Sequence, residues 1–200
     1  MIIEENMELK LILGIITTLL AFPTFIPYLK DIVQRKTEPH TYTWLIWTIL
    51  QSIGVYAGFQ DGGGFGMWGL AIGAVFCAII FLLSLKYGTT NITRFDLYCL
   101  VGAFITLGIY LFTNNGLLAV LLVAIIDFVG FLPTFRKGWE EPETETISTF
   151  GLSAFGNLLS VFALENYTFI TTLYVGSLLF TNTTFATMIY LRRTIFKKEK

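Results

Sequence analysis

The amino-acid sequence contains the same plan twice, and this internal repeat constrains the fold more than any other feature. Residues 22–57 align without a gap on residues 128–163, at a constant offset of 106 positions (27 to 133). In each copy an apolar segment ends at a proline, a charged loop follows, and a second apolar segment carries one amide. Such duplication predicts a fold built from repeated units. The matched pairs are Pro27 with Pro133, Lys30 with Arg136, Thr43 with Thr149, Gln51 with Asn157, Val55 with Val161 and Ala57 with Ala163.

The composition predicts a membrane protein. Hydrophobic residues make up 54% of the chain and charged residues 14%, and the mean hydropathy is +0.70. The charges form short clusters between long apolar runs, which is typical of a chain that lies in a lipid bilayer. The net charge of -1 gives no indication of a nucleic-acid partner. Cys77 and Cys99 lie in apolar segments, where we expect small hydrophobic side chains rather than a disulfide.

Seven apolar segments have about the length that a helix needs to cross a bilayer core of about 30 Å. The first follows Glu4, Glu5 and Glu8 rather than a basic start, so we interpret it as a retained helix and not as a signal peptide. Turn-forming residues at 61–66, 114–116 and 165–167 separate several of the segments. The predicted spans are 9–28, 41–59, 67–85, 95–113, 117–135, 147–164 and 168–191.

The distribution of cations predicts the orientation. With seven spans, every Lys and Arg except Lys10 falls on the side of the first, third and fifth connections and the C-terminal tail. Cytoplasmic loops carry an excess of Lys and Arg, which places the N-terminus outside and the C-terminus in the cytoplasm. We therefore expect a multi-pass protein of the cell membrane.

The repeat groups the predicted spans into an all-α fold of three helices, one linker helix and three helices. Spans one to three correspond to spans five to seven in the same direction, and the fourth span supplies the extra crossing that this parallel arrangement needs. The expected units are residues 1–88, 89–115 and 116–200, the last including the basic tail.

This plan, with a proline at the end of the first helix of each triplet, resembles the PQ-loop and SWEET superfamily of small membrane transporters. The superfamily's Pro-Gln dipeptide stands here as Pro27-Tyr28 and Pro133-Thr134. Asn182 falls where sugar-transporting members place an asparagine in the third helix of a triplet. The resemblance covers nearly the whole chain in topology, and it implies the transport of a small molecule between two three-helix bundles. The chain is also similar to small bacterial proteins of this type.

Asp127 is the first candidate for chemistry, because it lies about midway along the fifth predicted span. An ionised carboxylate in hydrocarbon costs roughly 2.5–3.5 kcal/mol, so an acid there is a functional candidate by default. Removal from water favours its protonated form. Two interpretations stay open: a group that couples a proton to transport, or a protonated acid that makes one structural hydrogen bond.

Paired amides near the middle of two spans predict a binding cavity. Gln51 and Asn157 occupy equivalent positions of the repeat, and helical periodicity places each on a face with further candidates. Parallel repeats pack about an axis along the membrane normal, so these faces would meet in a central cavity. The alternative is that the amides only join helices. The faces comprise Trp44, Trp47 and Gln51 on one side and Ser153, Asn157 and Ser160 on the other, with Trp44 also a candidate interfacial anchor and Trp47 the candidate for stacking on a ligand.

Prolines within apolar segments predict hinges. Pro23, Pro27 and Pro133 each remove a backbone donor, and a membrane tolerates the freed carbonyl only where another group satisfies it. Helix termination is the alternative for Pro27 and Pro133. Of the polar residues in the seventh span, Asn182 is the one that hydrogen bonds to its own helix do not readily explain.

These observations predict a carrier of a small polar or ring-containing metabolite that works by alternating access. Trp47, Gln51, Asn157 and Asn182 would hold the substrate, with Trp44 and Ser153 beside them. A non-transporting membrane receptor or scaffold is the alternative. An enzyme is not expected, because no acid and base converge; His40 is the only histidine, and neither a metal site nor a cofactor is predicted. The partners are the lipid bilayer and a small molecule, and a homo-oligomer stays open.

Overall fold

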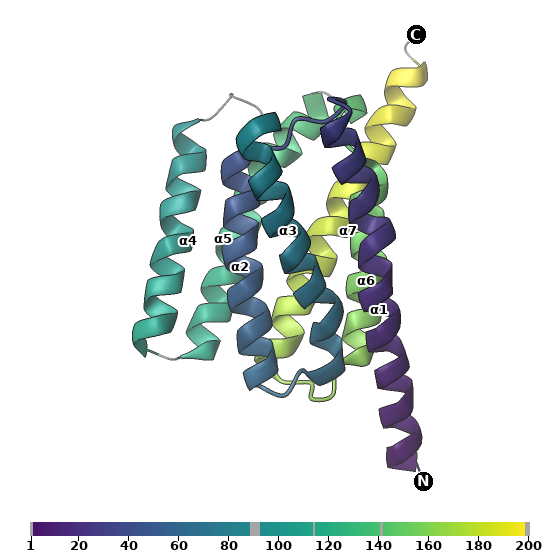
Figure 1. The fold of residues 1–200 in the computed structure, drawn as a ribbon, viewed down its shortest axis with the longest axis vertical. Helices are drawn as coiled ribbons and strands as arrows, with labels where there is room; N and C mark the ends of the chain where they lie inside the picture. The colour runs from purple at the N-terminus through teal and green to yellow at the C-terminus, as the bar shows by residue number, and fades with distance from the viewer. Residues whose placement is uncertain (1, 89–92, 114, 141, 199–200) are drawn as a thin grey trace.

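The computed structural model is an all-α bundle (Figure 1). It describes the backbone of residues 2–88, 93–113, 115–140 and 142–198, and the side chains of 2–6, 96, 99, 133, 136, 137, 140, 144 and 195–198 lie outside the description. The described residues contain seven α-helices, two short 3-10 helices and no strand. The α-helices are α1 (Ile2–Val33), α2 (Thr41–Gln60), α3 (Trp68–Tyr87), α4 (Arg94–Thr113), α5 (Gly116–Glu140), α6 (Ile147–Ala163) and α7 (Phe169–Lys198), and the 3-10 helices are Gly64–Met67 and Pro142–Thr144.

Each predicted apolar segment corresponds to one helix, but the expectation that the first helix of each repeat ends at a proline is wrong. Helix α1 continues past both Pro23 and Pro27 to Val33, and α5 continues past position 133 to Glu140. A proline inside a helix removes one hydrogen bond and bends the helix, but it does not end a helix that packs on its neighbours along its length. Helix α1 packs against both α3 and α6.

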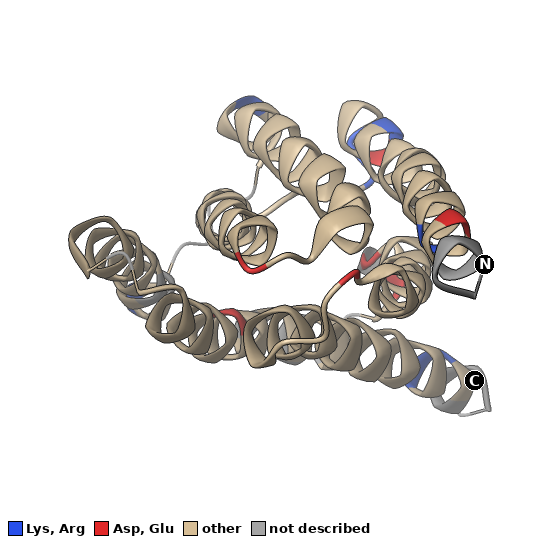
Figure 2. Cartoon of the chain, turned by 90° about the horizontal axis from the view of Figure 1, so that it is seen from below, with Lys and Arg blue, Asp and Glu red and all other residues tan. Residues whose placement is uncertain are grey.

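The helices pack in two similar groups. In the first, α3 packs closely along both α1 and α2, whose backbones stay further apart. In the second, α7 packs closely along both α5 and α6. Between the groups, α1 packs against α6 and α2 packs against α5. Helix α4 lies at the edge of the bundle against α2 and α5, as the views in Figures 1 and 2 show.

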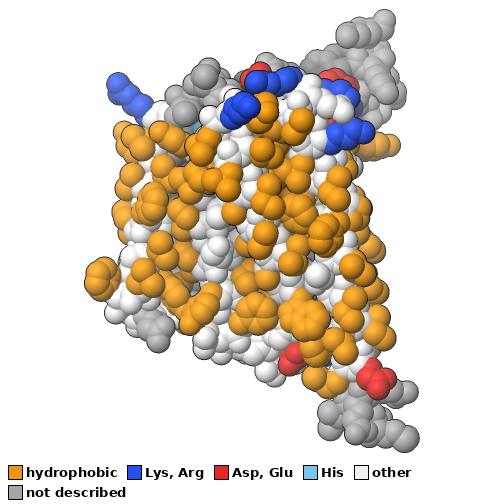
Figure 3. Space-filling view, viewed as in Figure 1, with side chains coloured by type: hydrophobic (Ala, Val, Ile, Leu, Met, Phe, Trp, Pro, Cys, Tyr) orange, Lys and Arg blue, Asp and Glu red, His pale blue; other side chains and the backbone are white. Residues whose placement is uncertain are grey.

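The face shown in Figure 3 is apolar over the middle of the bundle, with basic side chains toward one end and acidic side chains toward the other. Large hydrophobic side chains are exposed on every α-helix, among them Leu19, Leu82, Phe112, Phe128, Phe155 and Phe180, with Tyr56 on α2. The basic end of the bundle carries Lys30, Arg35, Lys36, Lys86, Arg94, Arg192 and Arg193, whereas Lys10 lies toward the opposite end, which we call the Lys10 end.

Two segments are long and apolar enough to cross a membrane, judged by length and composition. They are Met7–Val33 and Gly64–Tyr87. Three further apolar helical stretches are shorter: Leu100–Thr113, Gly116–Leu132 and Ile147–Ala163. These features indicate association with a membrane.

Candidate functional site

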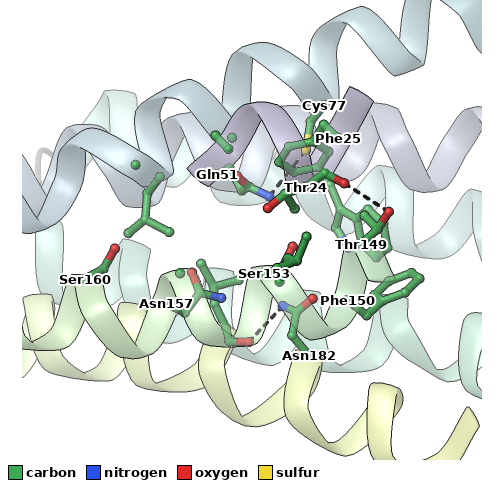
Figure 4. Close-up of a pocket in the computed structure, with 18 of the residues that line it drawn as sticks. Thr24, Phe25, Gln51, Cys77, Thr149, Phe150, Ser153, Asn157, Ser160 and Asn182 are labelled. Carbon is green, nitrogen blue, oxygen red and sulfur yellow. Dashed lines mark hydrogen bonds between the residues drawn. The ribbon is translucent and has the colours of Figure 1, made fainter. Parts of the chain in front are cut away.

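A cavity lies between the two helix groups, in the middle of the bundle (Figure 4). Its volume of about 80 Å³ exceeds the 10–15 Å³ or so that one water needs. Six helices contribute to its wall, and none of the side chains described on α4 does. Its lining includes Thr24, Trp44, Trp47, Gln51, Cys77, Asp127, Phe131, Thr149, Phe150, Ser153, Asn157 and Asn182.

All seven residues predicted to bind substrate or a proton line this one cavity. Trp44, Trp47 and Gln51 come from α2, because a spacing of three or four residues keeps them on one helical face. Ser153 and Asn157 come from α6, with Asp127 from α5 and Asn182 from α7. Figure 4 shows Gln51 across the cavity from Ser153, Asn157 and Asn182. The structure thus brings the candidates together, and their binding of a ligand stays a prediction.

The three amides of the cavity differ in their hydrogen bonds. Gln51 Nε2 donates to Cys77 Sγ at 3.3 Å, a weak acceptor. Asn182 Nδ2 donates to the carbonyl of Leu178 one turn earlier in α7 at 2.8 Å, so its nitrogen is used within its own helix. Asn157 is buried, and none of the hydrogen bonds drawn in Figure 4 involves its side chain. The amide oxygens of Gln51 and Asn182 remain available to a ligand.

Two buried polar atoms of the cavity wall have no hydrogen-bond partner among the described residues. They are Nε1 of Trp47 and Oδ2 of Asp127. The exposed fraction of Trp47 is 7% and that of Asp127 is 4%, so neither group is hydrated from the surface of the protein. An unpaired buried polar group costs about 1–3 kcal/mol, and such groups in native proteins indicate a bound water, ion or ligand. One orphaned donor and one orphaned acceptor therefore belong to residues of the same cavity wall.

Aromatic rings form the wall toward the basic end. Trp44 is only 4% exposed and packs against the rings of Tyr28 and Trp47, each at 5.1 Å between centroids. This burial inside the bundle does not fit an interfacial anchor, which places its ring at the membrane surface. Trp47 also contacts Phe131 on α5 at 5.0 Å.

Residues of α1 and α3 that sequence reasoning did not assign also line the cavity. Thr17 and Thr24 are seven residues apart on α1, two helical turns, and so share a face. This spacing could have assigned the two threonines to the cavity from the sequence. It carried little weight because threonines often bond to their own helix, as Thr24 Oγ1 does to Leu20 O at 2.7 Å. From α3, Gly73 and Cys77 complete the wall.

Two of the predicted hinge residues, Pro23 and Pro27, are not among the residues that line the cavity. Pro23 is exposed and Pro27 half-buried on α1, and the side chain of Pro133 lies outside the described residues. Of the remaining tryptophans, Trp68 and Trp139 are exposed near the helix ends.

The cavity contains one carboxyl group and no cationic side chain among the described residues. Asp127 is the only Asp or Glu in its lining, and no Lys, Arg or His lines it among the described residues.

Comparison with protein-family models, with curated proteins and with solved structures finds no significant match to this chain. The geometry and chemistry of the cavity are therefore the basis for assigning a function.

Proposed function

We propose that this chain is a multi-pass membrane protein whose seven helices all cross the bilayer. The support is the apolar surface around the middle of the bundle, since soluble monomers rarely expose contiguous apolar patches beyond a few hundred Å². Apart from Asp127 in the cavity, the described charged side chains lie toward the two ends. The basic end would face the cytoplasm by the positive-inside rule, in the cell membrane.

We further propose that the two helix groups are a duplicated three-helix unit of the PQ-loop and SWEET kind. The supporting observation is that each group has its third helix between the other two, and that α1 packs on α6 as α2 packs on α5. In the sequence repeat α1 corresponds to α5 and α2 corresponds to α6. The contact of α1 with α6 is therefore the counterpart of the contact of α5 with α2. Helix α4 then serves as the linker.

Within this frame we propose that the protein carries a small polar or ring-containing metabolite by alternating access. The observation that carries this proposal is the cavity between the two units, in which Trp47 Nε1 and Asp127 Oδ2 are buried without partners. A ligand between two units that move against each other is released to either side as they move. Asp127 would bind a proton in one part of that cycle.

A ligand screen followed by a flux assay tests this proposal. Thermal stability of the purified protein is measured against a metabolite library, on the wild type, on Asn157→Ala and on the control Gln60→Ala, an exposed amide outside the cavity. A ligand at 100 times its dissociation constant stabilises by about 2.7 kcal/mol. We expect a compound that shifts the wild type and the control but not Asn157→Ala, and that crosses the membrane of proteoliposomes. Binding without flux would instead indicate a receptor.

A further inference from the structure

We propose that the cavity selects ligands that carry a positive charge, in particular a protonated amine attached to a flat ring. This inference rests on the proposed binding function of the same cavity and names its ligand class. Three features of the wall support it: its carboxyl group, its aromatic rings and the orphaned tryptophan donor.

The carboxyl group of the wall favours a cation, because a cationic ligand stabilises its ionised form. Asp127 is 4% exposed, and its Oδ2 has no partner among the described residues. The other titratable group of the wall is the Cys77 thiol, which is held by Gln51. An ammonium group would supply both the hydrogen-bond donor and the counter-charge that the carboxylate lacks. An anionic ligand would face a buried carboxylate with no cation in the described lining to offset it, so anions are disfavoured.

The rings favour a cation that is organic. Phe131 follows Asp127 by one turn on α5, and its ring contacts that of Trp47 at 5.0 Å. Trp44 and Phe150 extend the aromatic wall. A cation over the face of a tryptophan is attracted by the ring, and a flat ligand ring packs against the same surface.

The unpartnered N–H of Trp47 favours an organic amine over a proton or a metal ion as the ligand. Trp47 Nε1 needs an acceptor, and neither a proton on Asp127 nor a bare cation provides one. A small amine that also carries a hydroxyl or carbonyl oxygen satisfies both orphaned atoms at once.

Three matched probes of one shape test the inference: tyramine, tyrosol and 4-hydroxyphenylacetate. They share the ring and the phenol oxygen, and end in an ammonium, a hydroxyl and a carboxylate. Calorimetry on the full-length protein in nanodiscs, with empty nanodiscs as the blank, gives the three affinities. We expect tyramine to bind about tenfold or more tightly than tyrosol, as a charge-assisted bond implies, and the carboxylate not to bind.

Asp127→Asn is expected to bring tyramine and tyrosol to within about twofold of each other, because the paired charge is lost. The control Glu165→Gln removes a carboxylate outside the cavity and should leave the preference intact. The inference is overturned if tyramine shows no saturable binding, if tyrosol or the carboxylate binds as tightly, or if the preference survives Asp127→Asn. If Asp127→Asn does not fold, it gives no affinities to compare. The comparison of the three probes on the wild-type protein then decides the inference by itself.

These measurements do not involve transport. A protein that prefers tyramine but moves nothing across a membrane would refute the carrier and leave the charge selectivity standing. A protein that transports an uncharged or anionic compound through the same cavity would refute the selectivity and leave the carrier standing.

Discussion

The hydroxyl of Thr149 on α6 donates a hydrogen bond of 3.1 Å to the backbone carbonyl of Thr24 on α1, and this buried bond joins the two helix groups beside the cavity. Thr149 is the repeat counterpart of Thr43, whose hydroxyl lies 3.2 Å from His40 Nδ1 at the start of α2. Two threonines at matching positions of the sequence repeat thus differ in role: Thr43 lies at a helix start, and Thr149 joins two helices.

Thr149→Val should lower the free energy of unfolding by about 0.6 kcal/mol, the average for a hydrogen bond between helices in a membrane. The substitution keeps the shape and removes the donor. Unfolding in mixed detergent micelles measures the change. The matched control is Thr184→Val, since Thr184 is exposed and bonds only to Phe180 O of its own helix. A larger loss in the control than in Thr149→Val would contradict the role of this bond.

We expect Glu165 to stabilise the packing of the chain segments at the Lys10 end of the bundle. Its Oε1 accepts from the backbone N–H of Phe65 at 3.1 Å, and Lys10 Nζ donates to its carbonyl oxygen at 3.2 Å. Gly64 adopts a φ of 51°, and the Glu165 carboxyl occupies the space that a β-carbon there would need. We expect Glu165→Ala to cost about 1–3 kcal/mol, as for a bond to a charged group, and Glu165→Gln less, because an acceptor oxygen remains. Thermal denaturation of both variants decides this, and equal losses would argue against it.

Gly54→Ala should disrupt the contact between α2 and α7. A β-carbon at Gly54 would overlap the ring of Tyr174, whose hydroxyl donates to Gln51 O at 3.3 Å. Overpacking of this kind costs about 1–3 kcal/mol. Gly151→Ala is the control, because no atom lies within 4 Å of its would-be β-carbon, and helix propensity predicts a neutral or slightly stabilising effect. The denaturation midpoints of the two variants should therefore move apart; a similar shift in both would be inconsistent with the packing.

Asp127→Asn should uncouple transport from a proton gradient. For a carrier that exchanges or moves one proton with its substrate, a gradient of one pH unit drives up to about tenfold accumulation, since each pH unit is worth 1.36 kcal/mol. In proteoliposomes, the variant is expected to equilibrate the substrate without accumulating it, because an amide cannot exchange a proton in this range. Glu165→Gln is the control that should still accumulate substrate. Accumulation by Asp127→Asn would exclude Asp127 as the coupling group.

Periodicity and the repeat predict the helices and much of the cavity wall. The residues Trp44, Trp47 and Gln51 share one face because α2 is one continuous helix over these positions, so spacing alone places them together. Asp127 stood out because an acid in an apolar segment needs a buried polar neighbourhood.

Other features depend on tertiary contacts that no local pattern carries. The continuation of α1 beyond Pro27 depends on packing against α3 and α6, which outweighs the local loss of a hydrogen bond. The burial of Trp44 depends on Tyr28, which is distant in sequence, and the contribution of Thr17 depends on the position of α1 beside α6. The hydrogen bond from the backbone N–H of Phe65 to the Glu165 carboxylate joins residues that are 100 positions apart in the sequence.

The most direct test of alternating access measures whether the cavity opens to both faces of the membrane. Ser153→Cys places a thiol in the cavity, in a chain whose Cys77 and Cys99 are changed to Ala, and Phe155→Cys places one on the exposed face of the same helix as control. A membrane-impermeant methanethiosulfonate is applied to right-side-out and to inverted vesicles. We predict that Ser153→Cys reacts in both preparations and Phe155→Cys in neither. Reaction of Ser153→Cys from one face only would contradict the carrier and indicate a receptor.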